Sequence, residues 1–572
     1  MISQIGFISL FLGLSFSLLI FLFSLLDVNN NSVRIDKKIP KLIFFQFCSV
    51  IFAFSFLIFA FLVSDFSNET VYNNSHSTKP LFYKITGVWG NHEGSLLLWL
   101  LVLTSFVLFF AIKSKNEPKN FRLHTILFHQ IITIGFFIFV LKTSSPFNLI
   151  FPVPSEGLGL NPILQDPALG IHPPILYVGY VGTSIVFASA LSAMINGYVN
   201  NEWAKNLKFW TFLSWIFLTG GILLGSIWAY YELGWGGFWF WDPVENISLM
   251  PWLSLTALLH CVVTLEKRNI LKNWTIILSL ITFMLSITGT FLVRSGILNS
   301  VHTFANDPAR GIYILIFLFV LIFISFIIFF LFENKNPEIK KEIFLLSKET
   351  SVLINNWFII YFLTVILVGT IYPIFLDVIS SEKISVGPPF YNKLILPFLL
   401  PFFLFMSIGP SMQWIKTNFK FKIKYIFYLF LTLAASLITV IFLNEKNILL
   451  YILFLALFYL AFKSLENFVI KKSNLAQSFS HLGFAMLMIS ILVNSFSSTE
   501  VIKNLNVGES FNLNNEKIFF KNVKTVKKNN YDSIQGLFEI TNNKNETIKL
   551  KPEIRIYNQP VIATSEAAIK TT

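Results

Sequence analysis

The chain has 572 residues and a formal net charge of +13, with 55% hydrophobic and only 13% charged residues. This composition excludes an assembly of soluble domains, in which about 25% of the residues are charged. The basic residues fall in short clusters between apolar segments rather than on one basic face, so they indicate membrane topology and exclude a nucleic-acid partner.

Apolar runs of about 20 residues recur from the N-terminus to Asn494, and each is long enough to cross a hydrocarbon core of roughly 30 Å as a helix. The sequence therefore predicts an all-α polytopic membrane protein with about fourteen transmembrane helices. We expect these helices near residues 4–26, 42–64, 95–112, 124–141, 173–196, 209–229, 249–265, 273–293, 312–332, 352–377, 394–413, 425–444, 447–465 and 478–496.

The Lys and Arg residues sort the connections between these helices into two alternating sets. Up to residue 497, one set holds 24 of them and the other holds 8. Because loops on the cytoplasmic side carry the excess of basic residues, we expect the N-terminus outside the cytoplasm. Fourteen crossings then return the chain to the outside, where the loops discussed below also lie.

The character of the sequence changes after Asn494. The stretches "NVGESFNLNNEKIFFKNVKTV" and "GLFEITNNKNETIKLKPEIRIY" alternate apolar and polar residues between Asn and Gly turns, which is typical of strands. We therefore predict a transmembrane domain over residues 1–497 and a small extracytoplasmic β domain over residues 498–572.

A tryptophan-rich loop, taken as residues 228–252, contains the stretch "WAYYELGWGGFWFWDPVEN", which has no Lys or Arg. One interpretation is a belt of interfacial tryptophans, whose rings are apolar and whose N–H groups face water. Such density in one loop favours the other interpretation, a surface that binds a flat aromatic ligand. The tryptophans concerned are Trp228, Trp235, Trp239 and Trp241.

The end of this loop predicts a helix start. Asp242, Pro243 and Glu245 fit the N-cap, N1 and N3 positions of a capping box. The helix that begins at the end of the loop therefore carries His260.

Two histidines are expected in outside loops. His172 lies in "LQDPALGIHPPILYVGYVG", where the two prolines suit the first turn of a helix, so His172 is expected just before that helix. His302 lies between Arg294 and Arg310 in the stretch "VRSGILNSVHTFANDPARG", which covers the loop and the residues on either side of it. Each of them alone would be explained as a solvated loop histidine.

Two other histidines lie inside predicted spans. His260 is ~9 Å from the cytoplasmic charge of Glu266 and His481 is ~13 Å from that of Lys472, at about 1.5 Å per helical residue. An imidazole in hydrocarbon is costly and usually paired or functional. At matching depth the two could be the axial ligands of one haem iron, or each could bond to a neighbouring helix.

These residues together resemble the CcmF family of haem lyases, within the haem-handling superfamily named for its Trp-rich WWD loop. The WWD loop alone indicates only the superfamily, and the combination with the long C-terminal half indicates this branch. The stretches that carry the resemblance are "WGNHEGSLLLW", "GIHPPILYVGYVG", "WGGFWFWDPVENISLMPWL", "GTFLVRSGILNSVHTFANDPARG", "VGTIYPIFLD", "ISVGPPFYN" and "SFSHLGFAMLMIS".

The resemblance implies an enzyme that receives haem from the chaperone CcmE and joins its vinyl groups to the CxxCH cysteines of apocytochrome c. CcmH and CcmI would bring the apocytochrome, and a membrane quinol would supply electrons. The implied location is the bacterial inner membrane, or that of mitochondria, with the N-terminus and the WWD loop on the periplasmic side. Because the family usually has a further span after the β domain, we expect this chain to be truncated before one.

The resemblance also implies residue roles. His172 and His302 match the two histidines that ligate the transient substrate haem, and His260 and His481 match the pair that holds a resident haem b. Arginines favour haem propionates because their planar donor geometry fits carboxylates. Besides the two histidines, the expected outer haem site comprises Trp228, Trp235, Trp239, Trp241, Asp242, Arg294 and Arg310.

Other functions stay open at this point. A haem exporter would move its ligand without apocytochrome and carry no stoichiometric haem b. A purely electron-transferring cytochrome b subunit would leave the outer histidines unused. A CcsA-type haem lyase usually has fewer spans, and a nitrite-reductase maturation lyase would differ only in its target motif.

Overall fold

The structure is a computed structural model of the chain. It describes residues 1–572 except 31–37, 233–236, 238, 295–307, 339–340, 381–383, 419–422, 470–474, 515, 543–545 and 571–572. The contacts divide the chain into two compact units, Met1–Glu338 with Asn504–Thr572, and Ile339–Lys503.

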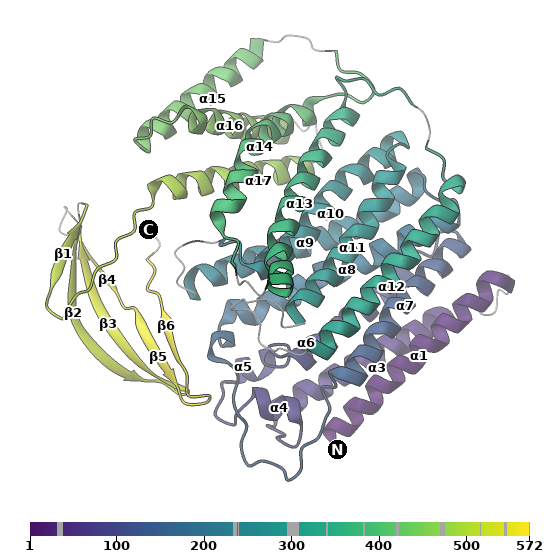
Figure 1. The fold of residues 1–572 in the computed structure, drawn as a ribbon, viewed down its shortest axis with the longest axis horizontal. Helices are drawn as coiled ribbons and strands as arrows, with labels where there is room; N and C mark the ends of the chain where they lie inside the picture. The colour runs from purple at the N-terminus through teal and green to yellow at the C-terminus, as the bar shows by residue number, and fades with distance from the viewer. Residues whose placement is uncertain are drawn as a thin grey trace. The chain divides into compact units, whose positions relative to one another are not determined.

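The first unit contains the N-terminal helices (Figure 1). They are α1 (Ile2–Asn30), α3 (Ile39–Leu62), α4 (Glu69–Asn74), α5 (Leu81–Thr86), α6 (His92–Lys113), α7 (Lys119–Thr143), η1 (Pro162–Leu164), α8 (Pro167–Ile195), α9 (Asn201–Glu232), α10 (Pro243–Arg268), α11 (Lys272–Arg294), α12 (Pro308–Phe332) and η2 (Glu333–Lys335).

Helix α8 is the most buried of the long helices and packs along α9. Glycines allow the two backbones to approach, since a Cβ atom at Gly179 would lie 2.3 Å from the backbone nitrogen of Leu218. A Cβ atom at Gly221 would lie 2.6 Å from the Cα atom of Leu176. Small residues at helix contacts are typical of membrane bundles, where close packing rather than water exclusion holds helices together.

The second unit is helical in the residues described. It comprises α13 (Lys348–Ser380), α14 (Pro388–Ile408), η3 (Gly409–Ser411), α15 (Ile423–Phe442), α16 (Ile448–Val469) and α17 (Leu475–Ser497).

In the parts of the chain that the structure describes, thirteen helices are long and apolar enough to cross a membrane. Each of the fourteen predicted spans falls on a helix, and the one at 425–444 corresponds to a shorter apolar stretch, Ile426–Phe442. The predicted fold class, a helical membrane protein with a small C-terminal β domain, is confirmed.

The β domain is one antiparallel sheet of six strands, and the contacts group it with the first unit. The strand order is β1-β2-β3-β5-β6, with β4 also paired to β3. The rings of Phe520 and Phe538 stack at a centroid distance of 4.4 Å between β2 and β3. The division at residue 497 stays a prediction. The strands are β1 (Ser510–Leu513), β2 (Glu516–Lys527), β3 (Tyr531–Thr541), β4 (Thr547–Leu550), β5 (Glu553–Tyr557) and β6 (Ala563–Glu566).

Candidate functional site

His172 lies inside α8 rather than before it. The helix begins at Pro167, and the Asp166 carboxylate caps it by accepting hydrogen bonds from the backbone N–H groups of Ala168 (2.8 Å) and Leu169 (3.0 Å). The prediction that the helix starts at the proline pair was wrong, because Asp166 and Pro167 already supply the N-cap and N1 residues. The pair lies inside the helix, directly after His172.

The His172 side chain packs against α9. Its Nδ1 atom donates a hydrogen bond of 2.7 Å to the carbonyl oxygen of Gly221. One turn further along α9, a Cβ atom at Gly225 would lie only 2.8 Å from the Cε1 atom of His172. The hydrogen bond fixes the tautomer, so the lone pair is on Nε2, the nitrogen that could bind a metal. Sequence reasoning missed both glycines, whose only signal was their spacing of one helical turn.

The predicted capping box at the end of the tryptophan-rich loop is confirmed. The Asp242 side chain accepts from the Val244 N–H at 2.9 Å, and Glu245 Oε2 accepts from the Asp242 N–H at 3.1 Å. Glu245 also accepts from the Phe240 N–H at 2.9 Å, which holds the loop against the start of α10.

Of the four tryptophans, two lie together in the described part of the loop. The rings of Trp239 and Trp241 are perpendicular with their centroids 6.2 Å apart. Trp228 lies inside α9, which continues to Glu232, so the loop is shorter than expected. The Trp228 side chain is only 2% exposed. Trp235 lies outside the described residues.

The second outer histidine, His302, and the side chain of Arg294 also lie outside the described residues. Arg310 is described, and its guanidinium is bonded within the bundle. Its Nη2 atom lies 3.0 Å from Glu93 Oε1, and its Nε atom donates to the carbonyl oxygen of Thr143 at 3.2 Å. These bonds tie α12 to α6 and to the end of α7, and a role with propionates stays a prediction.

His260 lies on α10 with its Nδ1 atom donating to the carbonyl oxygen of Thr256 at 2.7 Å. This bond leaves the lone pair on Nε2, so the residue fits an axial haem ligand. The Thr256 hydroxyl accepts from Trp215 Nε1 at 2.9 Å, and the rings of Trp215 and Trp252 stack with centroids 6.1 Å apart. His481 lies on α17 of the second unit, so its pairing with His260 stays a prediction.

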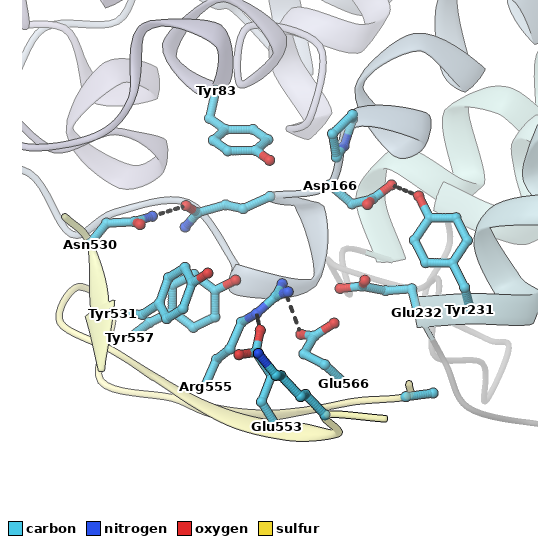
Figure 2. A pocket seen from close by; sticks show the side chains of 14 residues that line it. Tyr83, Asp166, Tyr231, Glu232, Asn530, Tyr531, Glu553, Arg555, Tyr557 and Glu566 are labelled. Carbon is cyan, nitrogen blue, oxygen red and sulfur yellow. Dashed lines mark hydrogen bonds and ion pairs between the residues drawn. The ribbon is translucent and has the colours of Figure 1, made fainter. Parts of the chain in front are cut away.

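A polar cavity of about 410 Å³ lies between the β domain and the ends of α8 and α9 (Figure 2). The Tyr231 hydroxyl donates to Asp166 Oδ1 at 2.5 Å, and Asn530 Nδ2 donates to Gln165 Oε1 at 2.8 Å. Sequence reasoning missed this cavity, because its walls come from segments far apart in the chain. Its lining comprises Tyr83, Gln165, Asp166, Pro167, Tyr231, Glu232, Asn530, Tyr531, Lys551, Glu553, Arg555, Tyr557, Glu566 and Ala567.

The β-domain wall of the cavity carries an ionic cluster. Arg555 Nε lies 2.6 Å from Glu553 Oε1, and Arg555 Nη1 lies 3.3 Å from Glu566 Oε1. Burial lowers the pKa of Arg555, but the hydrogen bond to Glu553 and the charge of Glu566 outweigh it and raise that pKa above its ordinary value. The arginine therefore stays charged and holds β5 to β6. Among the described residues, no group of three or more His, Cys, Asp or Glu side chains could hold a metal ion.

One lysine near this end of the helices has an unusual environment. Lys79, between α4 and α5, is buried and donates from Nζ to the carbonyl oxygen of Asn74 at 2.7 Å. Burial and the nearby charge of Lys84 lower the pKa of Lys79 to about 7.

Comparisons with known proteins agree along the whole chain. Residues 89–298 match the family model "Cytochrome C assembly protein", and residues 496–572 match "CcmF C-terminal beta-sandwich". The cytochrome c-type biogenesis protein CcmF of Haemophilus influenzae is 37% identical over 587 residues, which cover 100% of this chain and 90% of that protein. The corresponding protein CycK of Rhizobium meliloti is 39% identical over 520 residues, 87% of this chain and 77% of that protein.

A solved structure described as the cytochrome c haem lyase CcmF has the same fold. It superposes with a TM-score of 0.81 at 24% identity, covering 99% of this chain and 89% of that one.

Proposed function

Because the chain belongs to the CcmF family of multi-pass cytochrome c-type biogenesis proteins, we propose that it attaches haem covalently to apocytochrome c. The observation that supports this most is the hydrogen bond of 2.7 Å from His172 Nδ1 to the carbonyl oxygen of Gly221, which puts the lone pair of the neutral ring on Nε2, the nitrogen that could bind iron. A solvated loop histidine would not be held in one tautomer by the backbone of a neighbouring helix.

The reaction adds each cysteine S–H group across a haem vinyl group, so that one C–S and one C–H bond form and nothing leaves. The two thiols belong to the CxxCH motif of the substrate, and the chain therefore needs no nucleophile of its own. Its contribution is positioning, which alone can be worth several kcal/mol when reacting groups are held in line, roughly 7–11 in the best cases. Imidazoles that bind the iron and indoles that pack on the porphyrin can supply such positioning.

We assign the outer substrate haem to His172 and His302, with Trp239 and Trp241 against the porphyrin. The capping box of Asp242 and Glu245 would keep these tryptophans in place, since it fixes the loop to the rigid α10. Arg294 and Arg310 remain the candidates for the propionates. Arg310 would bind one through a guanidinium whose Nη2 atom also lies 3.0 Å from Glu93 Oε1.

A haem b held by His260 and His481, when bound, would supply electrons from a membrane quinol to keep the substrate iron reduced. On this chain, the carbonyl oxygen of Thr256 would orient the His260 ring, and Trp215 would hold Thr256 by donating to the Thr256 hydroxyl. Partners bonded behind a ligand histidine commonly tune its basicity and orientation.

The proposed partners are the haem chaperone CcmE, the apocytochrome-handling subunits CcmH and CcmI, and apocytochrome c. The proposed location is the bacterial inner membrane, with the N-terminus and the tryptophan-rich loop on the periplasmic side. The alternation of basic residues between connections supports this orientation.

The test compares His172→Ala with a matched control in cells that lack their own haem lyase. The control is His76→Ala, a histidine in the loop between α4 and α5 that bonds to Thr78. We expect His172→Ala to abolish covalent haem on cytochrome c and to keep the reduced haem b spectrum of the purified chain, whereas His76→Ala keeps both. An undiminished cytochrome c yield in His172→Ala would refute the outer-site assignment.

The resident haem is tested separately. His260→Ala and His481→Ala should each remove the low-spin haem b spectrum from the purified chain. A spectrum that survives in both variants would refute the assignment of this pair.

A further inference from the structure

We infer that Asp166, Tyr231 and Trp89 are positioning residues that hold the turn of α8 carrying His172. This inference rests on the proposed function, in which that histidine binds the iron of the substrate haem. It concerns the cavity wall, which the resemblance to haem lyases did not assign.

The turn that carries His172 is poorly supported by its own helix. Pro173 and Pro174 have no backbone N–H, so they cannot donate to the carbonyl groups of Leu169 and Gly170 four residues earlier. Two rungs of the hydrogen-bond ladder are thus missing where the first turn joins the rest of α8. The first turn is therefore tied to the rest of α8 by fewer backbone bonds, so that contacts from other segments help to set the position of the His172 backbone.

Side chains from other segments supply these contacts. Trp89, between α5 and α6, donates from Nε1 to the carbonyl oxygen of Gly170 at 2.9 Å, which is one of the two carbonyls that the prolines leave. At the start of the turn, Asp166 Oδ1 accepts both from the backbone of Ala168 and Leu169 and from the Tyr231 hydroxyl at 2.5 Å. Figure 2 shows the bond between Tyr231 and Asp166 at the edge of the cavity.

Tyr231 connects this turn to the tryptophan-rich loop. It is the second-last residue of α9, which extends to Glu232 and so into the range 228–252 taken as that loop. The same helix supplies the carbonyl oxygen of Gly221 to the His172 imidazole. Helix α9 therefore holds His172 at two points. Tyr231 bonds to Asp166, which caps the turn of α8 that carries His172, and Gly221 bonds to the His172 ring.

The experiment uses the full-length chain purified in detergent and the variants Tyr231→Phe, Trp89→Phe, Asp166→Asn and Asp166→Ala. Tyr531→Phe is the matched control, because Tyr531 lines the same cavity but lies on β3. Hydrogen exchange of the amides of residues 168–172, without added haem, measures how firmly the turn is held. Haem titration measures binding at the outer site, and the haem b spectrum reports on the rest of the bundle.

For Tyr231→Phe we expect faster exchange of these amides and roughly tenfold weaker haem binding, the loss typical of one charge-assisted hydrogen bond. The haem b spectrum should stay unchanged. Trp89→Phe should act in the same direction. Asp166→Asn should lie between wild type and Asp166→Ala, because asparagine is also a good N-cap and accepts hydrogen bonds but carries no charge. Asp166→Ala should lose both the cap and the bond to Tyr231.

Three results would overturn the inference. They are wild-type exchange and haem binding in Tyr231→Phe, an equal loss in Tyr531→Phe, and a loss of the haem b spectrum together with haem binding, which would show a general role in folding. The proposed function fails differently. If His172→Ala binds added haem as well as wild type, the outer-site assignment is wrong, while the exchange measurement still decides whether the turn is held by these side chains.

Discussion

The replacement of Gly225 by alanine tests the His172 site most directly. A Cβ atom there would lie 2.8 Å from Cε1, 3.2 Å from Nδ1 and 3.4 Å from Nε2 of His172. Carbon atoms pack at about 3.5–4.0 Å, so the imidazole must retreat from α9 by roughly 0.7–1.2 Å. This movement stretches the bond of 2.7 Å to Gly221 beyond the usual limit of about 3.2 Å.

A displacement of about 1 Å in a positioned group can cost on the order of 100-fold in rate. We therefore expect Gly225→Ala to lower the yield of covalent haem on cytochrome c by about that factor, measured by haem staining against protein level. The fold should be retained, because alanine is favoured over glycine in a helix by about 1 kcal/mol. The haem b spectrum of the purified chain checks this.

Gly220→Ala is the matched control on the neighbouring position of α9. A Cβ atom there would first meet Ile175 Cγ2 at 3.7 Å, which is an ordinary contact. This variant should mature cytochrome c like wild type. Equal yields in the two variants, whether both normal or both lost, would refute the reasoning that the His172 ring depends on the space at Gly225.

Three further predictions follow from other contacts. Asp242→Ala removes the cap of α10 and should cost about 1 kcal/mol of helix stability, seen as faster proteolysis of the tryptophan-rich loop, whereas Asp242→Asn should not show it. Arg310→Ala breaks the bonds to Glu93 and Thr143 and should lower the thermal midpoint of the detergent-purified chain. If Arg294 binds propionates alone, Arg294→Ala should weaken haem binding and leave the thermal midpoint unchanged. In the folded chain the pKa of Lys79 is lowered to about 7, so above that pH the unfolded chain binds more protons than the folded one. The free energy of unfolding should therefore rise between about pH 7 and 10.5. Lys79→Met should flatten this rise, measured by thermal unfolding at several pH values.

The features that the sequence predicted well are those encoded locally. Apolar runs of helical length predicted the spans, and the order Asp242, Pro243, Glu245 predicted a capping box that the structure confirms. Each depends on a few neighbouring residues and on the bilayer or the backbone, so no distant contact can change it.

The start of the helix that contains His172 was predicted wrongly, because two local patterns there each indicate a helix start. Asp166 and Pro167 have the same pattern as Asp242 and Pro243, yet the proline pair after His172 was taken as the helix start. A helix tolerates such a pair where other segments bond to the carbonyl groups it leaves, and Trp89 bonds in this way to Gly170. Those bonds are tertiary, and the sequence around residue 172 contains no trace of them.

The cavity and the contact of His172 with α9 could not be predicted for the same reason. Gly221 and Gly225 have a function only once α8 lies against them, and Tyr231 has one only once Asp166 is near. Such pairings depend on which helices become neighbours, a choice that spacing and composition do not specify.

The hydrogen bond between Asn530 and Gln165 joins residues 365 positions apart. A ribosome that adds about 5–20 residues per second needs roughly 20–70 seconds between making these two partners. During that interval the helices from α8 to α17 are made, and until the β domain follows, Asp166 and Tyr231 lack the strands that line their cavity. The wall that Asn530, Tyr531 and Arg555 form is therefore added to this cavity only after all the described helices have been synthesised.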